Sequence, residues 1–182
     1  MAQLPSGLRS IPCGIGLGTN VGKRIENLIF AAHAIIARVP YAKLTGVGGV
    51  YETAPVDCPE GSESFLNSVI EIETDAGPHV IHQALKEIEA EMGRPTQREK
   101  NAPRSIDLDI LYLGDRIINE PGLVIPHPRM HSRRFVLRPL ADIRPELTLP
   151  SLHSTVSEQL DSLADDADQV VLVRRDWLNA PV

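Results

Sequence analysis

The stretch LNSVIEIETDAGPHVIHQALKEIEAEMG, residues 66–93, decides the fold because its apolar pattern changes from the period of a strand to that of a helix. Residues Leu66 to Thr74 alternate in character along the chain, which predicts a strand with two different faces. From about Pro78 to Met92 the apolar side chains recur at helical spacing, and Gly93 is typical of a helix end. The stretch therefore predicts one strand followed by one amphipathic helix.

A second strand and helix are expected upstream, near the start of the chain. Ile11 to Leu17 has the apolar character of a strand, and Val21 to Val39 has a helical period. Thr19 or Asn20 could cap this helix, because both side chains can accept a hydrogen bond from the first turn. The apolar face of the helix is expected to contain Leu28, Ile29, Ala32, Ile35 and Ile36.

Two more strand-like segments complete the pattern, Leu44 to Glu52 and Ile106 to Leu113. The expected order is β-α-β-β-α-β. That order predicts an α+β fold, a ferredoxin-like sandwich with a mainly antiparallel sheet and helices packed on it.

The rest of the chain adds shorter elements. Pro126 to Ile143 predicts a loop and a short helix, Ser154 to Ala164 a helix, and Gln169 to Arg174 a strand. We expect a single domain over residues 1–182, with a core of about 11–150 and a C-terminal extension, 151–182, whose role the sequence leaves open.

Composition limits the classes of function. At 182 residues a single domain can bury roughly 70% of the surface of the unfolded chain, so it needs no disulfides. Cys13 and Cys58 have no zinc-type spacing and are expected to be reduced thiols of a cytoplasmic protein. A net charge of -6 disfavours a general nucleic-acid binder, and no apolar run approaches the ~20 residues of a membrane span.

The strongest chemical signal is a pair of carboxylates, Asp107 and Asp109, inside the apolar strand 106–113. The period of a strand places both on one face, about 6.6 Å apart along the chain. Their repulsion is about 2.5 kcal/mol at an effective dielectric of about 20, so a closed site that holds both in ionised form needs a cation. Oxygen ligands favour magnesium over zinc. The alternative is that one aspartate caps a turn and the other pairs with an arginine.

Basic residues precede this pair. Arg94, Arg98, Lys100 and Arg104 stand against a single acidic residue, Glu99. The segment could be a mobile clamp for a polyphosphate, because arginine matches phosphate oxygens in a bidentate fashion. The alternative is a solvated surface segment.

A third cluster, PHPRMHSRRF at 126–135, contains two histidines and three arginines. No cysteine or spaced carboxylate completes a tetrahedral zinc set, so hydrogen bonding to phosphate is favoured over zinc binding. Gly14, Gly16 and Gly18 lie within the first expected strand rather than after it, which favours close backbone packing over dinucleotide binding.

These segments together resemble the 6-hydroxymethyl-7,8-dihydropterin pyrophosphokinase family. The resemblance extends over roughly residues 11–150. It rests on GTN at 18–20, YETAP at 51–55, FLN at 65–67, APRSIDLDI at 102–110, PHPRM at 126–130 and FVLRPL at 135–140.

The resemblance implies a ferredoxin-like fold and transfer of the β,γ-pyrophosphoryl group of ATP to the pterin hydroxymethyl group in folate synthesis, releasing AMP. By resemblance, Asp107 and Asp109 bind two magnesium ions, and Arg94 and Arg104 are loop arginines that act on the triphosphate. The implied ATP site also includes Glu89, Ile110, His127 and Arg133. The implied pterin site contains Thr53, Val56, Phe65, Asn67 and Phe135, with the pterin stacked between the two phenylalanine rings.

Charge predicts the mechanism: two metals and positioned arginines stabilise the negative charge that builds up as the alcohol attacks the β-phosphorus. No side chain is an obvious general base, and either aspartate could take the proton directly or through water. The loop 94–104 is expected to order when ATP and pterin are both bound.

Two other functions stay open at this level. One is a DxD-type nucleotidyl- or glycosyltransferase, and the other is a non-catalytic pterin- or nucleotide-sensing module. The expected partners are the two small substrates, without nucleic acid or membrane, and the expected state is a monomer.

Overall fold

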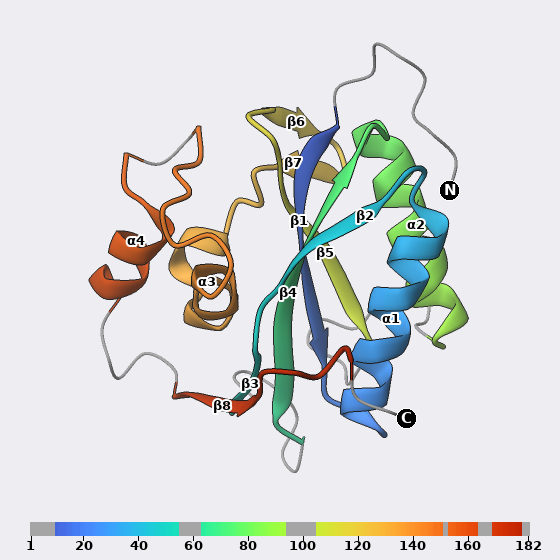
Figure 1. Ribbon diagram of the computed structural model, residues 1–182, viewed down its shortest axis with the longest axis vertical. Coiled ribbons are helices and arrows are strands. Elements are labelled where there is room, and N and C mark those ends of the chain that lie inside the picture. The colour runs from blue at the N-terminus through green and yellow to red at the C-terminus, as the bar shows by residue number, and fades with distance from the viewer. Residues whose placement is uncertain (1–9, 55–62, 94–104, 151–152, 164–168, 180–182) are drawn as a thin grey trace.

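The structure, a computed structural model, describes residues 10–54, 63–93, 105–150, 153–163 and 169–179. Figure 1 shows a sheet with helices on both sides. Helices α1 (Arg24–Arg38) and α2 (Pro78–Glu91) pack on one face. Helix α3 (Arg134–Ala141) packs on the other face, and α4 (Val156–Ser162) packs against α3.

The main sheet has six strands in the order β5-β1-β4-β3-β8, and β2 also pairs with β4. Every pairing in it is antiparallel. Because β4 lies between β1 and β3, and β1 lies between β4 and β5, the sheet contains two interleaved split βαβ units. The expectation of a ferredoxin-like sandwich is confirmed. The strands are β1 (Ile11–Thr19), β2 (Lys43–Val47), β3 (Val50–Thr53), β4 (Phe65–Thr74), β5 (Asp107–Leu113) and β8 (Val170–Arg174).

Three short elements follow β5. A separate hairpin contains β6 (Ile118–Glu120) and β7 (Leu123–Ile125), and the 3-10 turn η1 (Met130–Ser132) leads into α3. The loop and short helix expected for residues 126–143 are therefore present.

The expected strand 44–52 is two strands, because the chain breaks at Gly48 and Gly49. A Cβ atom at Gly48 would lie 2.3 Å from the carbonyl oxygen of Pro139, so only glycine fits beneath α3 at this point. The Gly48 carbonyl accepts hydrogen bonds from the Ser68 hydroxyl and the Trp177 indole instead of continuing the strand.

The start of α1 also differs from the expectation. The helix begins at Arg24 and not near Val21, and Thr19 and Asn20 do not cap it. Thr19 is the last residue of β1 and both side chains are buried, while Gly22 turns the chain with a φ of 69°. Of the two residues that suggested a cap, Thr19 thus belongs to the strand, and Asn20 directly follows it.

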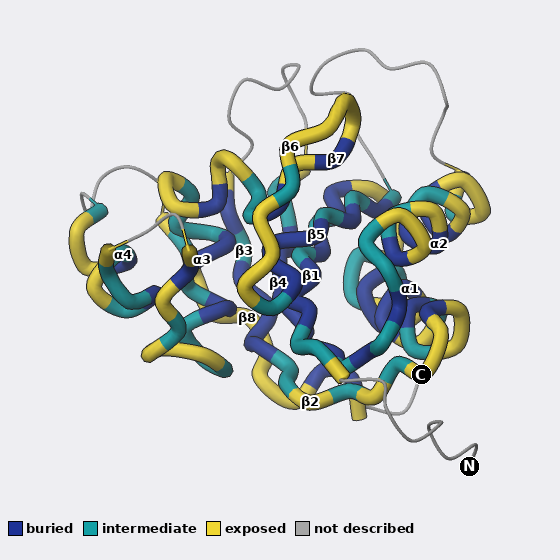
Figure 2. Tube along the Cα trace, turned by 90° about the horizontal axis from the view of Figure 1, so that it is seen from above, coloured by how far each residue is buried: buried dark blue, intermediate teal, exposed yellow. Residues whose placement is uncertain are grey.

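The core has two parts, one on each face of the sheet (Figure 2). The larger part lies between the sheet and α1 and α2, and the smaller part lies beneath α3 and α4. The glycines of β1 serve close packing, as expected: a Cβ atom at Gly14 would lie 2.1 Å from the ring of Tyr112.

The end of the chain returns to the sheet. β8 pairs with the free edge of β3, and Trp177 is fully buried in the larger core, where its indole nitrogen donates to the Gly48 carbonyl at 2.9 Å. Part of the segment 151–182 therefore completes the sheet edge. In the described ranges, no helix is both long and apolar enough to span a bilayer.

Candidate active site

The two aspartates lie on one face of β5, as their spacing predicts. Asp107 and Asp109 are half-exposed and alternate with the buried Leu108 and Ile110, which pack toward α1 and α2. The aspartates therefore face the side that carries α3. Asp107 is the first residue of the strand, and Asp109 lies inside it.

A row of residues crosses the sheet at this level. Asn67 of β4 pairs with Gly18 of β1, which in turn pairs with Asp107 of β5. Directly opposed residues share a face, and adjacent strands lie about 4.8 Å apart, so Asn67 and Asp107 lie on either side of Gly18 and are separated from each other by about twice that distance. A Cβ atom at residue 18 would lie 3.2 Å from Asn67 Oδ1 and 3.9 Å from Asp107 Cβ. The glycine thus keeps open the space between an amide and a carboxylate.

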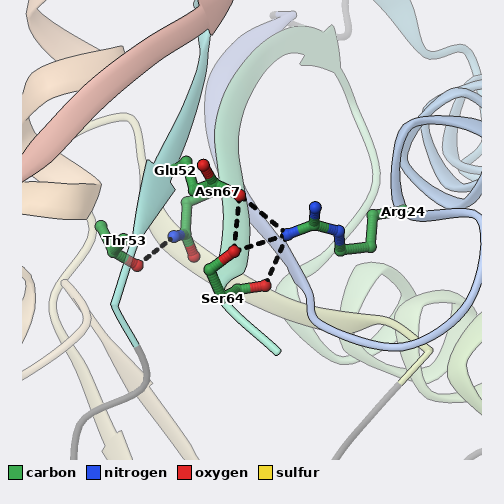
Figure 3. Close-up of polar contacts among 5 residues, drawn as sticks. All are labelled: Arg24, Glu52, Thr53, Ser64 and Asn67. Carbon is green, nitrogen blue, oxygen red and sulfur yellow. Dashed lines mark hydrogen bonds and ion pairs between the residues drawn. The ribbon is translucent and has the colours of Figure 1, made fainter. Parts of the chain in front are cut away.

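At one end of this row, a hydrogen bond to Thr53 holds the Asn67 side chain in place. Asn67 and Thr53 are 7% and 5% exposed, and Asn67 Nδ2 donates to Thr53 Oγ1 at 3.0 Å (Figure 3). Within the described ranges, the Asn67 side chain makes this one hydrogen bond, through its nitrogen. Its oxygen, Oδ1, lies next to Gly18 and can accept a hydrogen bond from a ligand. A buried acceptor of this kind favours a ligand with N–H donors.

His127 approaches the carboxylate end of the site. Its backbone N–H donates to the Leu111 carbonyl, and its Nε2 lies 4.0 Å from Asp109 Oδ2. Nδ1 accepts from the Arg129 backbone N–H at 3.2 Å, so in the neutral ring Nε2 carries the proton. Burial lowers the pKa of His127, and Arg133 and Arg129 lower it further against the opposing effect of Asp109. The ring is therefore a neutral donor at pH 7 that points toward the aspartates.

The two phenylalanines of the expected pterin site are half-exposed. Phe65 starts β4 opposite Thr53, and Phe135 lies in the first turn of α3. The guanidinium of Arg133 lies over the Phe135 ring, 5.4 Å from its centroid. Arg133 thus connects the aromatic part of the site with the cluster around His127.

Glu89 lies at the outer edge of β5 and is 2% exposed. Its Oε1 accepts from the Leu108 backbone N–H at 2.8 Å, and its Oε2 lies 2.8 Å from Lys86 Nζ. The side chain of Ile110 is buried in the core, so this residue can offer only backbone atoms to a ligand. Glu89 therefore fixes the strand that carries the aspartates.

In the described ranges, no three His, Cys, Asp or Glu side chains gather closely enough to hold a metal ion by themselves. The donor set of Asp107 and Asp109 fits magnesium, which usually keeps water and phosphate oxygens in its coordination shell. The sequence expectations for Val56, Arg94 and Arg104, and for the loop 94–104, lie outside the described residues.

Comparison with known proteins decides the family. The profile of 7,8-dihydro-6-hydroxymethylpterin-pyrophosphokinase (HPPK) matches residues 14–145. The chain belongs to this family. The 2-amino-4-hydroxy-6-hydroxymethyldihydropteridine pyrophosphokinase of Bacillus subtilis is 40% identical over 129 residues, which cover 71% of this chain and 75% of the relative.

Longer members of the family show where the match ends. A folic acid synthesis protein of Dictyostelium discoideum is 35% identical over 143 residues, which cover 79% of this chain and 21% of that protein. A Plasmodium falciparum HPPK-DHPS structure matches with a TM-score of 0.68 at 17% identity, covering 86% of this chain and 44% of the other. The chain thus spans about a fifth of the Dictyostelium protein and less than half of the Plasmodium protein. At 17% identity, the structural match shows the fold alone.

Two polar residues of α1 that the sequence did not single out reach toward the site. Arg24 contacts Glu52 and Ser64, and Asn27 contacts Thr19 and Ser105. Both lie on the first turn of a surface helix, where polar residues are ordinary. These four partners are between 8 and 78 residues away in the sequence, so helical periodicity carries no signal for the contacts.

Proposed function

We propose that this chain transfers the pyrophosphoryl group of ATP to 6-hydroxymethyl-7,8-dihydropterin, at a site that Asp107 and Asp109 form with two magnesium ions. The row Asn67–Gly18–Asp107 is the observation that carries the proposal. It places an amide suited to a heterocyclic edge and a carboxylate suited to a metal on either side of an open glycine.

The pterin occupies the amide half. Asn67 Oδ1 accepts from an N–H group of the pterin, while Thr53 holds the amide in the required orientation. Phe65 and Phe135 stack on the flat ring, and Val56 contributes backbone contacts. The hydroxymethyl group then extends over Gly18 toward Asp107.

The triphosphate occupies the carboxylate half. Magnesium held there by Asp107 and Asp109 would neutralise phosphate charge and lower the pKa of the attacking hydroxyl group. The Nε2–H group of His127 donates a hydrogen bond to a phosphate oxygen, and Arg133, Arg94 and Arg104 supply positive charge as the transition state forms. The ribose and base lie along the edge of β5, near Glu89 and the backbone of Ile110.

The reaction exchanges one phosphorus–oxygen bond for another. The pterin hydroxyl oxygen bonds to the β-phosphorus, the bond from the β-phosphorus to the oxygen bridging to the α-phosphorus breaks, and AMP leaves with that oxygen. Asp107 or Asp109 takes the hydroxyl proton directly or through water. We also propose that the chain acts as a monomer in the cytoplasm, in keeping with the buried free thiol of Cys13.

A product assay tests this function. Wild-type protein incubated with ATP, magnesium and the hydroxymethyl pterin should release AMP in equal amount to a pterin diphosphate. Release of ADP, or of pyrophosphate with a pterin nucleotide, would instead indicate a kinase or a DxD-type nucleotidyltransferase. Binding of both ligands without turnover would indicate a sensing module.

A further inference from the structure

We propose that the first turn of α1 is a two-armed positioning element, in which Arg24 holds the pterin half of the site and Asn27 holds the metal half. The proposal rests on the proposed function, because that function assigns the two halves. The hydrogen bonds of both residues reach positions one or two residues away from Thr53, Phe65, Gly18 and Asp107, so both act through the backbone that they fix.

The first arm is Arg24, the first residue of α1. Its Nη1 donates to Glu52 Oε1 at 3.0 Å and to the Ser64 carbonyl and hydroxyl oxygens at 2.8 Å each (Figure 3). The Ser64 hydroxyl also donates to Glu52 Oε1. Hydrogen bonds from Ser64 and then Arg24 lower the pKa of Glu52, so its carboxylate is ionised at neutral pH. Residues from α1, from β3 and from the segment before β4 thus form one cluster.

The position of this cluster decides what it can do. Glu52 immediately precedes Thr53, and Ser64 immediately precedes Phe65. Thr53 and Phe65 are paired with each other across β3 and β4. Successive side chains of a strand point to opposite faces, so holding Glu52 and Ser64 on the α1 side presents Thr53 and Phe65 on the other side. Figure 3 shows Arg24 approaching the strands from α1 on one side, while the Thr53 side chain lies on the other side. Arg24 therefore fixes the spacing and orientation of the strand ends that form the pterin half.

The second arm is Asn27, which lies one turn along the helix. Its Nδ2 donates to the Val21 carbonyl at 2.9 Å, the Ser105 carbonyl at 3.1 Å and Thr19 Oγ1 at 3.3 Å. Ser105 lies two residues before Asp107, and Thr19 follows Gly18. Asn27 therefore ties the end of β1 to the start of β5, the strand that carries both aspartates.

The two arms predict separable kinetic effects, which a purely structural role would not produce. Arg24→Gln should raise the KM for the pterin about tenfold, because hydrogen bonds to a charged group are worth roughly that factor or more. The KM for ATP should change less than about twofold. Arg24→Lys, which keeps a cation, should recover part of the loss.

Arg38→Gln is the matched control for the first arm. Arg38 is at the other end of α1 and forms an ion pair with Glu91 of α2, with a side chain about as exposed as that of Arg24 (35% and 27%). It should lower the Tm by a similar amount to Arg24→Gln and leave both KM values unchanged.

Asn27→Leu tests the second arm, because leucine has a similar size and no donor. It should lower kcat and raise the magnesium concentration for half-maximal activity about tenfold, while the Kd for the pterin stays within about twofold of wild type. Glu26→Gln, which removes the exposed pair with Lys23, is the control and should change neither.

The two-armed proposal would be overturned if each variant, Arg24→Gln and Asn27→Leu, changed the KM for the pterin and the magnesium concentration for half-maximal activity by the same factor. A fall in Tm with no change in either quantity would also overturn it. Wild-type protein that releases no AMP would instead overturn the proposed function. If a variant is too unstable to assay, titration of pterin into folded Arg24→Lys gives the same comparison.

Discussion

Two carboxylates on the same face of the sheet, Glu71 and Asp109, lie in very different surroundings. Glu71 is 4% exposed and accepts hydrogen bonds from Thr45, Tyr112 and Arg144 at 2.7–2.9 Å. The side chain of Asp109 is 45% exposed. Among the basic side chains that the structure describes, the one within 4.0 Å of its carboxylate is His127, through Nε2. A carboxylate whose acceptors are all used stabilises the fold, whereas one left open is available to a ligand.

The pKa of Glu71 also reflects its hydrogen bonds. Burial opposes its ionisation, but the hydrogen bonds from Arg144, Tyr112 and Thr45 outweigh burial and hold its pKa below the usual value. A carboxyl group with a depressed pKa stabilises the folded state above its unfolded pKa, and this contribution is lost as the pH falls through the folded pKa. Glu71 therefore contributes to stability, whereas the proposed function assigns the pair in β5 to chemistry.

The largest expected effect is on turnover. Asp109→Asn and Asp107→Asn should each lower kcat by roughly 10²–10³-fold or more, because in the proposed function each aspartate is a metal ligand in the transition state. The Tm should stay constant or rise, since a repulsive charge is lost. The control is Asp115→Asn in the exposed turn after β5, and near-normal kcat in both site variants would refute the metal assignment.

At Glu71 we expect a smaller effect, on stability and not on turnover. Glu71→Gln should lower the free energy of unfolding by about 2 kcal/mol, a fall of roughly 4–8 °C in Tm, because charge-assisted hydrogen bonds become neutral ones. The values of kcat and KM for the folded fraction should stay near those of wild type. A large loss of kcat with unchanged Tm would reverse the roles of the two carboxylates.

The aromatic residues should show a modest, ligand-selective effect. Phe65→Ala and Phe135→Ala should each weaken pterin binding by about 0.5–1.5 kcal/mol beyond lost area, or roughly two- to tenfold, and ATP binding less. Phe30→Ala on the exposed face of α1 is the control for loss of a ring. Equal losses for pterin and ATP in calorimetric titrations would place the pterin elsewhere.

The smallest expected effect concerns pH. The pKa of His127 is lower in the folded protein than the usual value, so the unfolded chain takes up the proton first as the pH falls. The contribution of this residue to stability is therefore full above about pH 7 and decreases below the unfolded pKa of about 6.5. Thermal melts between pH 7 and 5.5 should show a smaller decrease for His127→Gln than for wild type, and equal slopes would exclude this cause.

Local pattern predicted much of the fold, and the exceptions have a common reason. The strand 66–74 and the helix ending at Gly93 depend on periodicity within one element, and both are present as expected. The break at Gly48 depends on Pro139 and Trp177, which are far away in the sequence. The start of α1 differs because Thr19 and Asn20 are buried at the end of β1.

The site divides in the same way. The shared face of Asp107 and Asp109 follows from the period of a strand, so the sequence predicted it. The row that joins Asp107 to Asn67 through Gly18 depends on the register of three strands, which the sequence does not state. The local pattern carries no signal for Arg24 and Asn27, because their contacts with Glu52, Ser64 and Ser105 join positions 28 to 78 residues apart.

The most direct test of the site is the position of the metal ions relative to the pterin. Crystals of wild-type protein with manganese, a non-hydrolysable ATP analogue and the hydroxymethyl pterin would locate the ions by anomalous scattering. We predict ions within about 2.0–2.3 Å of carboxylate oxygens of both Asp107 and Asp109, with the pterin hydrogen-bonded to Asn67 and its hydroxymethyl group above Gly18. Ions bound away from both aspartates, or a pterin outside the row Asn67–Gly18–Asp107, would contradict this assignment.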